Sequence, residues 1–506
     1  MKTQILFRPV WTCGRYNEEH HAALMYNLLE GFSYYFENES ADVIGELLKI
    51  ERNGCFNIND ISRATMICVE SLETFFDELQ KYNLITTECP TQYGIFDYRK
   101  RLGEYKCKHT QTVERTVQEK LPFAVSSAEI NYTNRVGGIT NVMFELTYNC
   151  SEKCIHCYNP GATRNDSEIS HRGDRNELVL NDYQRIIDEL YELGVTKICL
   201  SGGDPFSKPI IWNIIDYIYK KEIAIIIFTN GQRIVNQVER LADYYPLTVG
   251  ISIYSGIAED HDYITRIKGS WEKSMSVVRR LSKLAVPMNI KCCVMKPNVK
   301  SYYMVADIAK QYGAIPQFEI SVTDSIEGDK CVSRNLRLTP DLLEIVLRDN
   351  NIPLYVGSEA PNYGGQVKDL EKAACGAGCN SFCITPEGNV QPCCAFPYSI
   401  GNLKRNTLKD VLASEKLKYW QKLRLKDYEE CGIHDYCDYC NLCTGTNFSE
   451  NGTPLKASEN NCYIAKNRCN LANKLKSGYD SLEGMTLQDC LNRKNVQLNA
   501  LKRDYN

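Results

Sequence analysis

The cysteines of this chain are unevenly distributed, and this distribution limits the possible folds more than any other feature of the sequence. Of 24 cysteines, three lie within residues 150–157 and eleven lie between Cys375 and Cys469. In a small secreted protein they would form disulfides, but a chain of 506 residues whose start shows no export signal is expected to be cytoplasmic. Cytoplasmic cysteines in tight groups are more often metal ligands. The sequence therefore predicts two metal-binding segments, and the scattered cysteines are interpreted as small buried apolar residues.

The overall composition gives no reason to expect a nucleic acid or a membrane as partner. The formal net charge is −4, with 43% hydrophobic and 24% charged residues, as in ordinary globular proteins. No apolar run approaches the roughly 18 residues that a membrane span needs. The length predicts two to four domains.

Residues 1–90 are predicted to form a small α+β domain of winged-helix outline. Two strands are expected around the turn at Glu30 and Gly31, followed by three helices and a short closing strand at residues 84–87. This region holds seven Lys and Arg against fourteen Asp and Glu, so DNA phosphates would repel it. We expect it instead to bind a peptide along an exposed strand edge. The predicted elements are strands 22–27 and 32–36 and helices 40–50, 58–65 and 69–82.

Residues 91–138 are predicted to be a linker, and regular alternation of strands and helices begins after it. Strands that alternate with amphipathic helices indicate a parallel sheet. Six such units over residues 139–345 are fewer than the eight of a closed barrel, so the fold class is predicted to be α/β with an open, partial (β/α)6 barrel. The strands are expected at 141–148, 196–201, 224–229, 247–254, 287–295 and 315–322, and helices at 181–193, 210–221, 272–285 and 299–312.

Beyond residue 345 the alternation fades and glycine, asparagine and cysteine become frequent. Residues 346–470 carry too little apolar sequence for a core of their own, so we expect metal clusters to hold this domain together. The tail, residues 471–506, is charged and has no assigned role.

The first cysteine group follows the first predicted strand of the barrel, in ELTYNCSEKCIHCYN. The spacing places the thiolates of Cys150, Cys154 and Cys157 on one short loop. A cubane iron–sulfur cluster normally has four thiolate ligands, so three leave one iron open to a chelating substrate. A zinc knuckle is the alternative, but it needs a fourth ligand that His156, between two ligand cysteines, is poorly placed to supply.

This loop and the segments after it resemble the radical S-adenosylmethionine superfamily. The resemblance implies that Cys150, Cys154 and Cys157 bind a [4Fe-4S] cluster whose open iron chelates S-adenosylmethionine. In that family an aromatic residue before the third cysteine lies against the adenine, and here His156 takes its place. Other segments correspond to family cofactor contacts: CLSGGDPF, FTNG, GISIYS and HDYITRIKGSW. The contacts implied are Gly202, Gly203, Asp204 (in place of the usual Glu), Thr229, Asn230, Ser252 and Arg266.

The second cysteine group resembles the SPASM extension, an iron–sulfur domain that binds two auxiliary [4Fe-4S] clusters. The resemblance implies one ligand set of Cys431, Cys437, Cys440 and Cys462, and another of Cys375, Cys393 and Cys443. The fourth position of the latter is open between Cys379, Cys383 and a substrate thiol. His434 stands where relatives have a cysteine, so either His434 or Cys437 is the ligand, and Cys437 is favoured because thiolates are the commoner iron ligands. A zinc ribbon is the alternative fold.

The N-terminal domain resembles the leader-recognition domains of peptide maturases of the ranthipeptide and sactipeptide type. Together the resemblances imply an oxidoreductase-type enzyme that generates a 5′-deoxyadenosyl radical and modifies a ribosomally made peptide. Thioether crosslinking is the favoured outcome. Carbon–carbon or ether crosslinking, epimerisation and sulfatase-type oxidation are alternatives, and a zinc-rich scaffold or an iron–sulfur regulator are alternatives of another class. The implied partners are a substrate with a leader sequence and an electron donor such as flavodoxin or ferredoxin. No catalytic side chain is identified.

Overall fold

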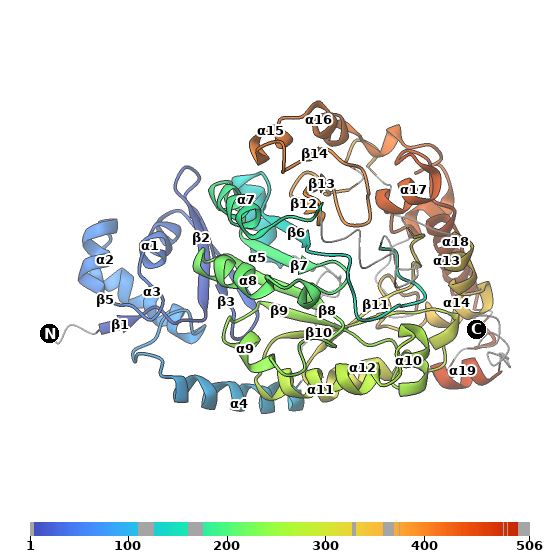
Figure 1. Cartoon of the computed structure of the whole chain (residues 1–506), viewed down its shortest axis with the longest axis horizontal. Helices are drawn as coiled ribbons and strands as arrows, with labels where there is room; N and C mark the ends of the chain where they lie inside the picture. Colours follow the sequence, from blue (N-terminus) through green and yellow to red (C-terminus); the bar gives the residue numbers. More distant parts are fainter. Residues whose placement is uncertain are drawn as a thin grey trace.

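A computed structural model gives the fold of the chain. It describes residues 5–109, 126–159, 176–325, 330–357, 369–373, 375–478, 480–482 and 484–493. Figure 1 shows an N-terminal domain beside a central sheet flanked by helices, with the cysteine-rich C-terminal segment covering one end of that sheet. Among the described helices, none is both long and apolar enough to span a membrane.

The N-terminal domain has one three-stranded antiparallel sheet, in the order β2-β3-β4, and a separate β1–β5 pair. The predicted strands and helices are present, but the segment at 84–87 forms only an isolated bridge between Phe7 and Thr86. Strand β2 was not predicted because Gly14 and Arg15 interrupt any apolar alternation. The elements are β1 Ile5–Phe7, β2 Thr12–Asn17, β3 Ala22–Asn27, β4 Phe32–Glu37, α1 Glu39–Leu48, β5 Cys55–Asn57, α2 Ile58–Thr65 and α3 Val69–Lys81.

The segment predicted to be a linker contains two helices, α4 Gln92–His109 and α5 Ser127–Val136. Helix α4 runs along a barrel helix, and α5 packs on strands β3 and β4. The N-cap hydroxyl of Ser126 accepts a hydrogen bond from the Glu129 backbone, and the Glu129 carboxylate accepts one from the Ser126 backbone, so a capping box starts α5. These helices connect the N-terminal domain to the barrel.

The central sheet confirms the predicted α/β partial barrel. Six parallel strands follow one another in the order β6 to β11, each within a few residues of its predicted position. The strands are β6 Asn141–Glu145, β7 Lys197–Ser201, β8 Ala224–Thr229, β9 Thr248–Ser252, β10 Met288–Cys293 and β11 Ile315–Glu319. The helices are α7 Leu180–Glu192, η2 Pro205–Ser207, α8 Ile211–Lys220, α9 Val238–Ala242, α10 Ala258–Thr265, α11 Ser270–Lys283, η3 Lys296–Asn298 and α12 Met304–Gln311.

The C-terminal segment extends this sheet. Strand β12 pairs in parallel with β6, and β13 and β14 follow in antiparallel pairs, so the sheet has nine described strands. The expectation that clusters alone hold this segment together is wrong, because Phe382, Phe396 and Trp420 belong to the same buried core as the barrel. The remaining elements are α13 Lys330–Leu336, α14 Pro340–Val346, β12 Ser381–Ile384, β13 Asn389–Gln391, β14 Gly401–Asn402, α15 Leu408–Leu412, α16 Glu415–Lys422, η4 Leu425–Asp427, η5 Asp435–Tyr439, α17 Thr444–Asn451, α18 Glu459–Lys476 and α19 Leu487–Arg493.

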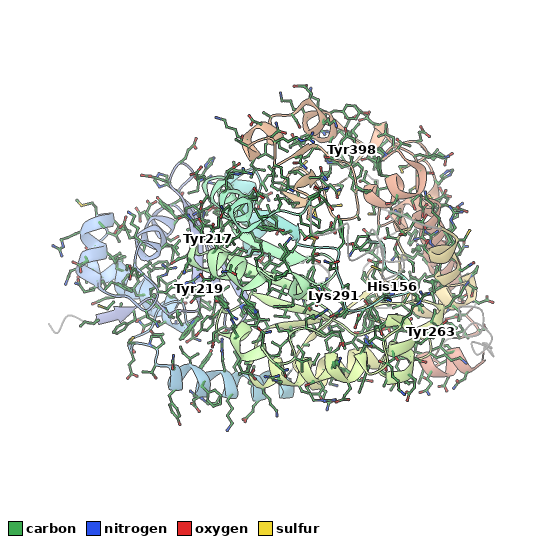
Figure 2. The ribbon with its side chains drawn as sticks, viewed as in Figure 1. His156, Tyr217, Tyr219, Tyr263, Lys291 and Tyr398 are labelled. Atoms are coloured by element: carbon green, nitrogen blue, oxygen red, sulfur yellow. The ribbon has the colours of Figure 1, made fainter. Side chains whose placement is uncertain are left out.

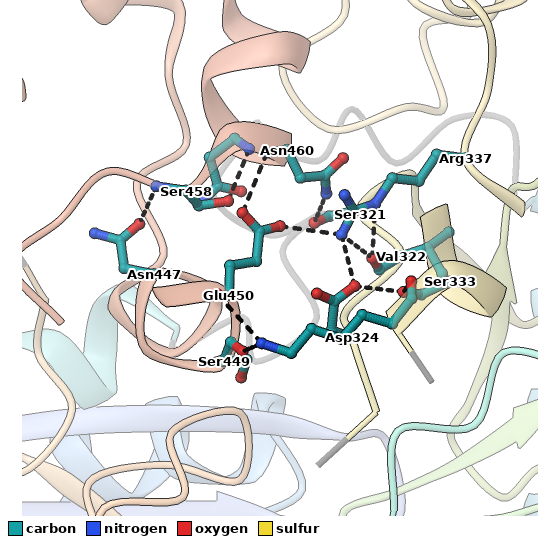
Figure 3. Close-up of polar contacts among 12 residues, drawn as sticks. Ser321, Val322, Asp324, Ser333, Arg337, Asn447, Ser449, Glu450, Ser458 and Asn460 are labelled. Carbon is teal, nitrogen blue, oxygen red and sulfur yellow. Dashed lines mark hydrogen bonds and ion pairs between the residues drawn. The ribbon is translucent and has the colours of Figure 1, made fainter. Parts of the chain in front are cut away.

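A buried charge cluster joins the end of the barrel to the C-terminal segment (Figure 3). Arg337 forms ion pairs of 3.0 Å with both Asp324, which follows β11, and Glu450 on α17. Its guanidinium also donates to the carbonyl of Val322. The carboxylates of Asp324 and Glu450 are almost fully buried, so Arg337 compensates two charges that water cannot reach.

Replacing Arg337 with alanine should destabilise the protein by about 3–5 kcal/mol, because it leaves buried carboxylates without their cation. The matched control is Arg279→Ala, which removes an exposed ion pair with Glu272 and should cost less than about 1 kcal/mol. Urea denaturation followed by tryptophan fluorescence measures both. Equal, small losses in the two variants would contradict the structural role of Arg337.

Candidate functional site

The candidate site lies at the carboxyl edge of the central sheet, where the loops after four neighbouring strands meet. The cysteine loop follows β6, the Gly-Gly-Asp segment follows β7, Thr229 ends β8 and Ser252 ends β9. Because the strands are parallel, these loops share one edge of the barrel, which is where barrel enzymes place their active sites.

Backbone hydrogen bonds hold the cysteine loop in place. The amides of Lys153 and Ile155 donate to the carbonyls of Thr265 and Ile264 at the end of α10, both at 3.0 Å. The side chain of Ile155 is buried in an apolar cluster with Tyr254 and Ile264. The loop is therefore fixed from both its backbone and its side chains.

Two donors contact the first thiol of the loop. The sulfur of Cys150 accepts hydrogen bonds from the side-chain amide of Asn230 at 3.3 Å and from the backbone amide of Glu152 at 3.4 Å. Cys154 and Cys157 are partly buried, and burial raises the pKa of both thiols. The charges of Cys150 and Cys157 raise the pKa of Cys154 further. Thiolates so close together need a cation, and bound metal would displace their protons.

The number of thiols on this loop bears on which metal group it could hold. Cys150, Cys154 and Cys157 all lie on the short loop after β6, and three thiolates would leave one iron of a cubane without a protein ligand. A zinc knuckle would instead need a fourth ligand from the protein.

The Gly-Gly-Asp segment packs directly against the backbone before the first cysteine. The amides of Gly203 and Asp204 donate to the carbonyls of Thr147 and Asn149, at 2.7 and 3.0 Å. A Cβ on Gly203 would lie 2.5 Å from the Asn149 carbonyl oxygen, so no larger residue fits. The sequence explains these glycines by close approach to a cofactor, whereas the structure shows close approach to the cysteine loop itself.

Asp204 carries an unpaired buried oxygen beside this loop. The side chain is fully buried, its Oδ1 accepts a 2.6 Å hydrogen bond from Thr229, and its Oδ2 has no partner within the described part of the chain. Burial raises the pKa of Asp204 to about 6. A buried carboxylate with a spare acceptor next to Cys150 fits the cationic end of a cofactor such as an ammonium group.

His156 is a neutral ring at the wall of the site (Figure 2). Burial lowers the pKa of His156 to about 4, so the imidazole is uncharged near neutral pH. The ring stands edge-on to Tyr254, with centroids 4.7 Å apart, and its Nδ1 is buried without a described partner. Such a ring can contact an adenine and accept a hydrogen bond from it.

The other predicted contacts differ in how close they lie to the cysteines. Asn230 contacts Cys150, Thr229 holds Asp204, and Ser252 lies beside the hydroxyl of Tyr254. Arg266 is exposed, ends α10 in a left-handed conformation with φ 57°, and has no described side-chain bond to the cysteine loop. Sequence patterns did not identify Tyr254 as part of the site, nor Glu152, whose buried Oε1 also has no described partner.

Four of the predicted auxiliary ligands line one pocket. A solvent-connected pocket is bordered by Cys431, Cys437, Cys440 and Cys462. His434 does not line it: this ring is exposed and stacks on Tyr436, with centroids 4.9 Å apart. The geometry therefore favours Cys437 over His434 as the ligand.

The second predicted auxiliary set also comes together. Cys393 and Cys375 each lie close enough to Cys443 that its charge raises the pKa of both thiols. Of the candidates for a fourth ligand, Cys379 lies near Cys375, and the fully buried Cys383 on β12 lies near Cys393. The fourth position stays open between Cys379, Cys383 and a substrate thiol.

Comparison with known proteins gives matches to both cysteine-bearing regions. Residues 144–301 match the radical SAM superfamily, and residues 375–444 match the SPASM iron–sulfur cluster-binding domain. The mycofactocin maturase of Mycobacterium tuberculosis is 31% identical over 343 residues, which cover 63% of this chain and 81% of the maturase. The antilisterial bacteriocin subtilosin biosynthesis protein of Bacillus subtilis is 26% identical over 334 residues, covering 65% and 70%.

One solved structure resembles nearly the whole chain. The crystal structure of Streptococcus suis SuiB bound to the precursor peptide SuiA superimposes with a TM-score of 0.52 over 90% of this chain and 99% of SuiB. The identity is 14%, so the likeness concerns the fold alone. It extends over the N-terminal domain, the barrel and the C-terminal segment.

The two candidate ligands can be told apart by iron content. Cys437→Ala should lower the iron of the anaerobically reconstituted protein by about four atoms per chain, because it removes a ligand from the wall of the pocket. His434→Ala should keep the iron of the parent, which is about twelve atoms if three cubanes form. Iron analysis with electron paramagnetic resonance measures both variants. Iron loss in His434→Ala alone would reverse the assignment.

Proposed function

We propose that this chain, which belongs to the radical S-adenosylmethionine superfamily and carries a C-terminal SPASM domain, modifies a ribosomally made peptide. The favoured product is a thioether between a cysteine sulfur and a carbon atom of the same peptide. The observation that carries this proposal is the presence of three separate cysteine sets in one molecule, the first beside the unpaired carboxylate of Asp204. The names of the relatives support it, since they include a bacteriocin biosynthesis protein and a maturase.

The cofactors of the family are a [4Fe-4S] cluster, S-adenosylmethionine and auxiliary clusters in the SPASM domain, as predicted. When bound, the first cluster and S-adenosylmethionine supply abstraction of a hydrogen atom from an unactivated C–H bond. Cys150, Cys154 and Cys157 would hold the cluster, and Asp204 would bind the ammonium group of the cofactor.

The remaining residues of the site orient these groups and exclude water. Thr229 fixes the carboxylate of Asp204, and Asn230 donates to the Cys150 sulfur. His156 and Tyr254 would form an uncharged wall against the adenine. The auxiliary clusters that the cysteine sets around Cys443 and Cys437 would hold would accept the electron that crosslinking releases. A flavodoxin or ferredoxin would supply electrons for the first cluster.

The N-terminal domain would bind the leader of the substrate. Strand β4 is the edge of the three-stranded sheet, and aromatic side chains join it to α3. Phe36 packs edge-on against Phe75 with centroids 5.9 Å apart, and Tyr34 lies 5.0 Å from Tyr82. An edge strand beside a partly exposed aromatic row suits an extended peptide with apolar side chains.

The reaction can be tested with peptides encoded by short reading frames beside the gene. The reconstituted protein with S-adenosylmethionine and a reductant should remove two hydrogen atoms from one such cysteine-containing peptide. The product should resist thiol alkylation, as a thioether does. Replacing Cys150, Cys154 and Cys157 together by alanine should abolish both this product and cofactor cleavage, and mass spectrometry measures both. A crosslink that leaves every cysteine thiol free would contradict thioether formation.

The leader interaction can be tested separately. Phe75→Ala should weaken binding of a fluorescent leader peptide about ten-fold, since a partly buried aromatic contact contributes about 1–2 kcal/mol. Met66→Ala is the matched control, because Met66 is apolar and 88% exposed but lies at the end of α2. Fluorescence anisotropy measures both. Leader affinity that is unchanged in Phe75→Ala would argue against binding beside β4 and α3.

A further inference from the structure

The inner wall of the partial barrel carries polar side chains that the cofactor contacts leave unused. Along β6, Val142 and Phe144 pack in the main core, whereas Met143 belongs to a separate small cluster with Cys199 and Cys383. Successive strand residues point to opposite faces, so Met143 marks the inner face of the barrel. Glu145, two residues further along, continues this inner face at the carboxyl edge.

Glu145 lies between the first cysteine loop and the C-terminal segment. It is the last residue of β6 and is 3% exposed. Its negative charge raises the pKa of Cys157 on one side and of Cys394 on the other. Cys394 directly follows Cys393, a predicted auxiliary ligand. The carboxylate therefore lies between the two places where hydrogen and electrons would leave the substrate.

Glu145 can accept a further hydrogen bond besides the one that it accepts from Tyr148. The hydroxyl of Tyr148 donates to Oε2 of Glu145 at 3.1 Å. A carboxylate has about four lone-pair positions, so one phenol leaves room for a second donor. Asp204 and Glu152 also keep an oxygen without a described partner, but the charges of both act on Cys150 in the first cysteine loop. Oε1 of Glu319 already accepts from two backbone amides, at 2.9 and 2.7 Å.

Lys291 adds a cation to the same inner wall (Figure 2). Its ammonium group lies 3.6 Å from the centroid of the Phe228 ring, and the charges of Cys199 and Cys394 act on it. The inner wall therefore carries a carboxylate at the end of β6 and an ammonium group on β10.

We propose that Glu145 accepts the proton that the substrate loses during crosslinking, a role that rests on the function proposed above. Thioether formation breaks one substrate C–H bond and one S–H bond and makes one C–S bond. The carbon would lose a hydrogen atom to the adenosyl carbon that bound S-adenosylmethionine supplies, and the sulfur would lose a proton to Glu145. The remaining electron would be accepted by an auxiliary cluster that the cysteine sets of the C-terminal segment would hold.

The electrostatics of the site suit this role. Burial raises the pKa of Glu145 to about 7, the hydrogen bond from Tyr148 opposes that shift, and the charge of Glu387 adds to it. A proton acceptor works best when its pKa is near the working pH. The ionisable groups that interact with Glu145 are Tyr148, Glu387, Cys157, Tyr158, Cys383 and Cys394.

The test uses the reconstituted full-length enzyme and the peptide that the wild-type enzyme crosslinks. Glu145→Gln should lower the rate of crosslinking about 100-fold or more, while iron content and cleavage of S-adenosylmethionine to 5′-deoxyadenosine persist. Glu145→Asp keeps a carboxylate and should recover at least a tenth of the wild-type rate. Mass spectrometry quantifies the crosslinked peptide and 5′-deoxyadenosine in the same samples.

Two neighbouring variants separate a proton acceptor from a structural residue. Tyr148→Phe removes a bond that lowers the pKa of Glu145, so the acidic limb of the pH–rate profile should move to higher pH. Glu387→Gln removes a charge that raises this pKa, so the limb should move to lower pH with the maximal rate kept. These opposite shifts would not follow from a packing role.

Three results would overturn the proposal: crosslinking by Glu145→Gln within two-fold of wild type, Glu145→Asp no faster than Glu145→Gln, or an unmoved acidic limb in both neighbouring variants. If Glu145→Gln loses iron, the aspartate variant and the two pH profiles decide. A wild-type enzyme that crosslinks no peptide would instead refute the proposed function, which keeps the two failures distinct.

Discussion

The position of the cysteine loop depends on one close backbone contact. The segment from Thr147 to Asn149 lies against Gly202 and Gly203, and its carbonyls accept hydrogen bonds from the amides of Gly203 and Asp204. Gly202 has φ 124°, a conformation that side chains strongly disfavour, and a Cβ there would lie 2.4 Å from the Thr147 carbonyl. Larger residues would push the first cysteine away from the neighbouring loops. The position of Cys150 relative to Asp204 and Asn230 therefore follows from two glycines on the next strand.

The same region retains groups that destabilise the protein when no cofactor is bound. Asp204 and Glu152 each keep a buried oxygen without a described partner, and each such group costs about 1–3 kcal/mol. Burial raises the pKa of Glu152 to about 8 and of Asp204 to about 6. Unsatisfied buried acids persist where a ligand completes them. Their position beside three thiols is consistent with a cationic ligand that arrives together with a cluster.

The sequence predicted the elements that depend on local pattern, and it failed where contacts are distant in the chain. Six barrel strands were predicted because each is an apolar run between amphipathic helices. The pairing of β12 with β6 was not predicted, because the two strands lie more than 200 residues apart in the sequence. The predicted linker does connect the N-terminal domain to the barrel, but it contains helices α4 and α5, and the polar sequence of α4 did not show that this helix packs on α11.

Among the site residues too, local sequence patterns were predictive and contacts between distant segments were not. The spacing of the first cysteines was enough to predict that loop, since its three thiols are local in sequence. Spacing alone did not decide whether His434 or Cys437 is the metal ligand. The fold separates the two, because Cys437 lines the pocket whereas His434 is exposed to solvent. Arg266 was predicted as a cofactor contact from its position in the sequence. In the structure it stands at the left-handed end of α10 and is exposed, and the backbone carbonyl of Thr265 contacts the cysteine loop.

The pairing of β12 with β6 has a consequence for electron transfer. The first cysteine loop follows β6, while Cys393 follows β13, the hairpin partner of β12. The register Ser381 to Asn141 therefore fixes the separation of the two cysteine sets through hydrogen-bonded strands, not through a flexible linker. The pairing also covers the edge of β6, which would otherwise be open to other strands. This pairing therefore extends the open sheet from β6 to β14 and sets the distance between the clusters that the two cysteine sets would hold, in a segment that shares the core of the barrel.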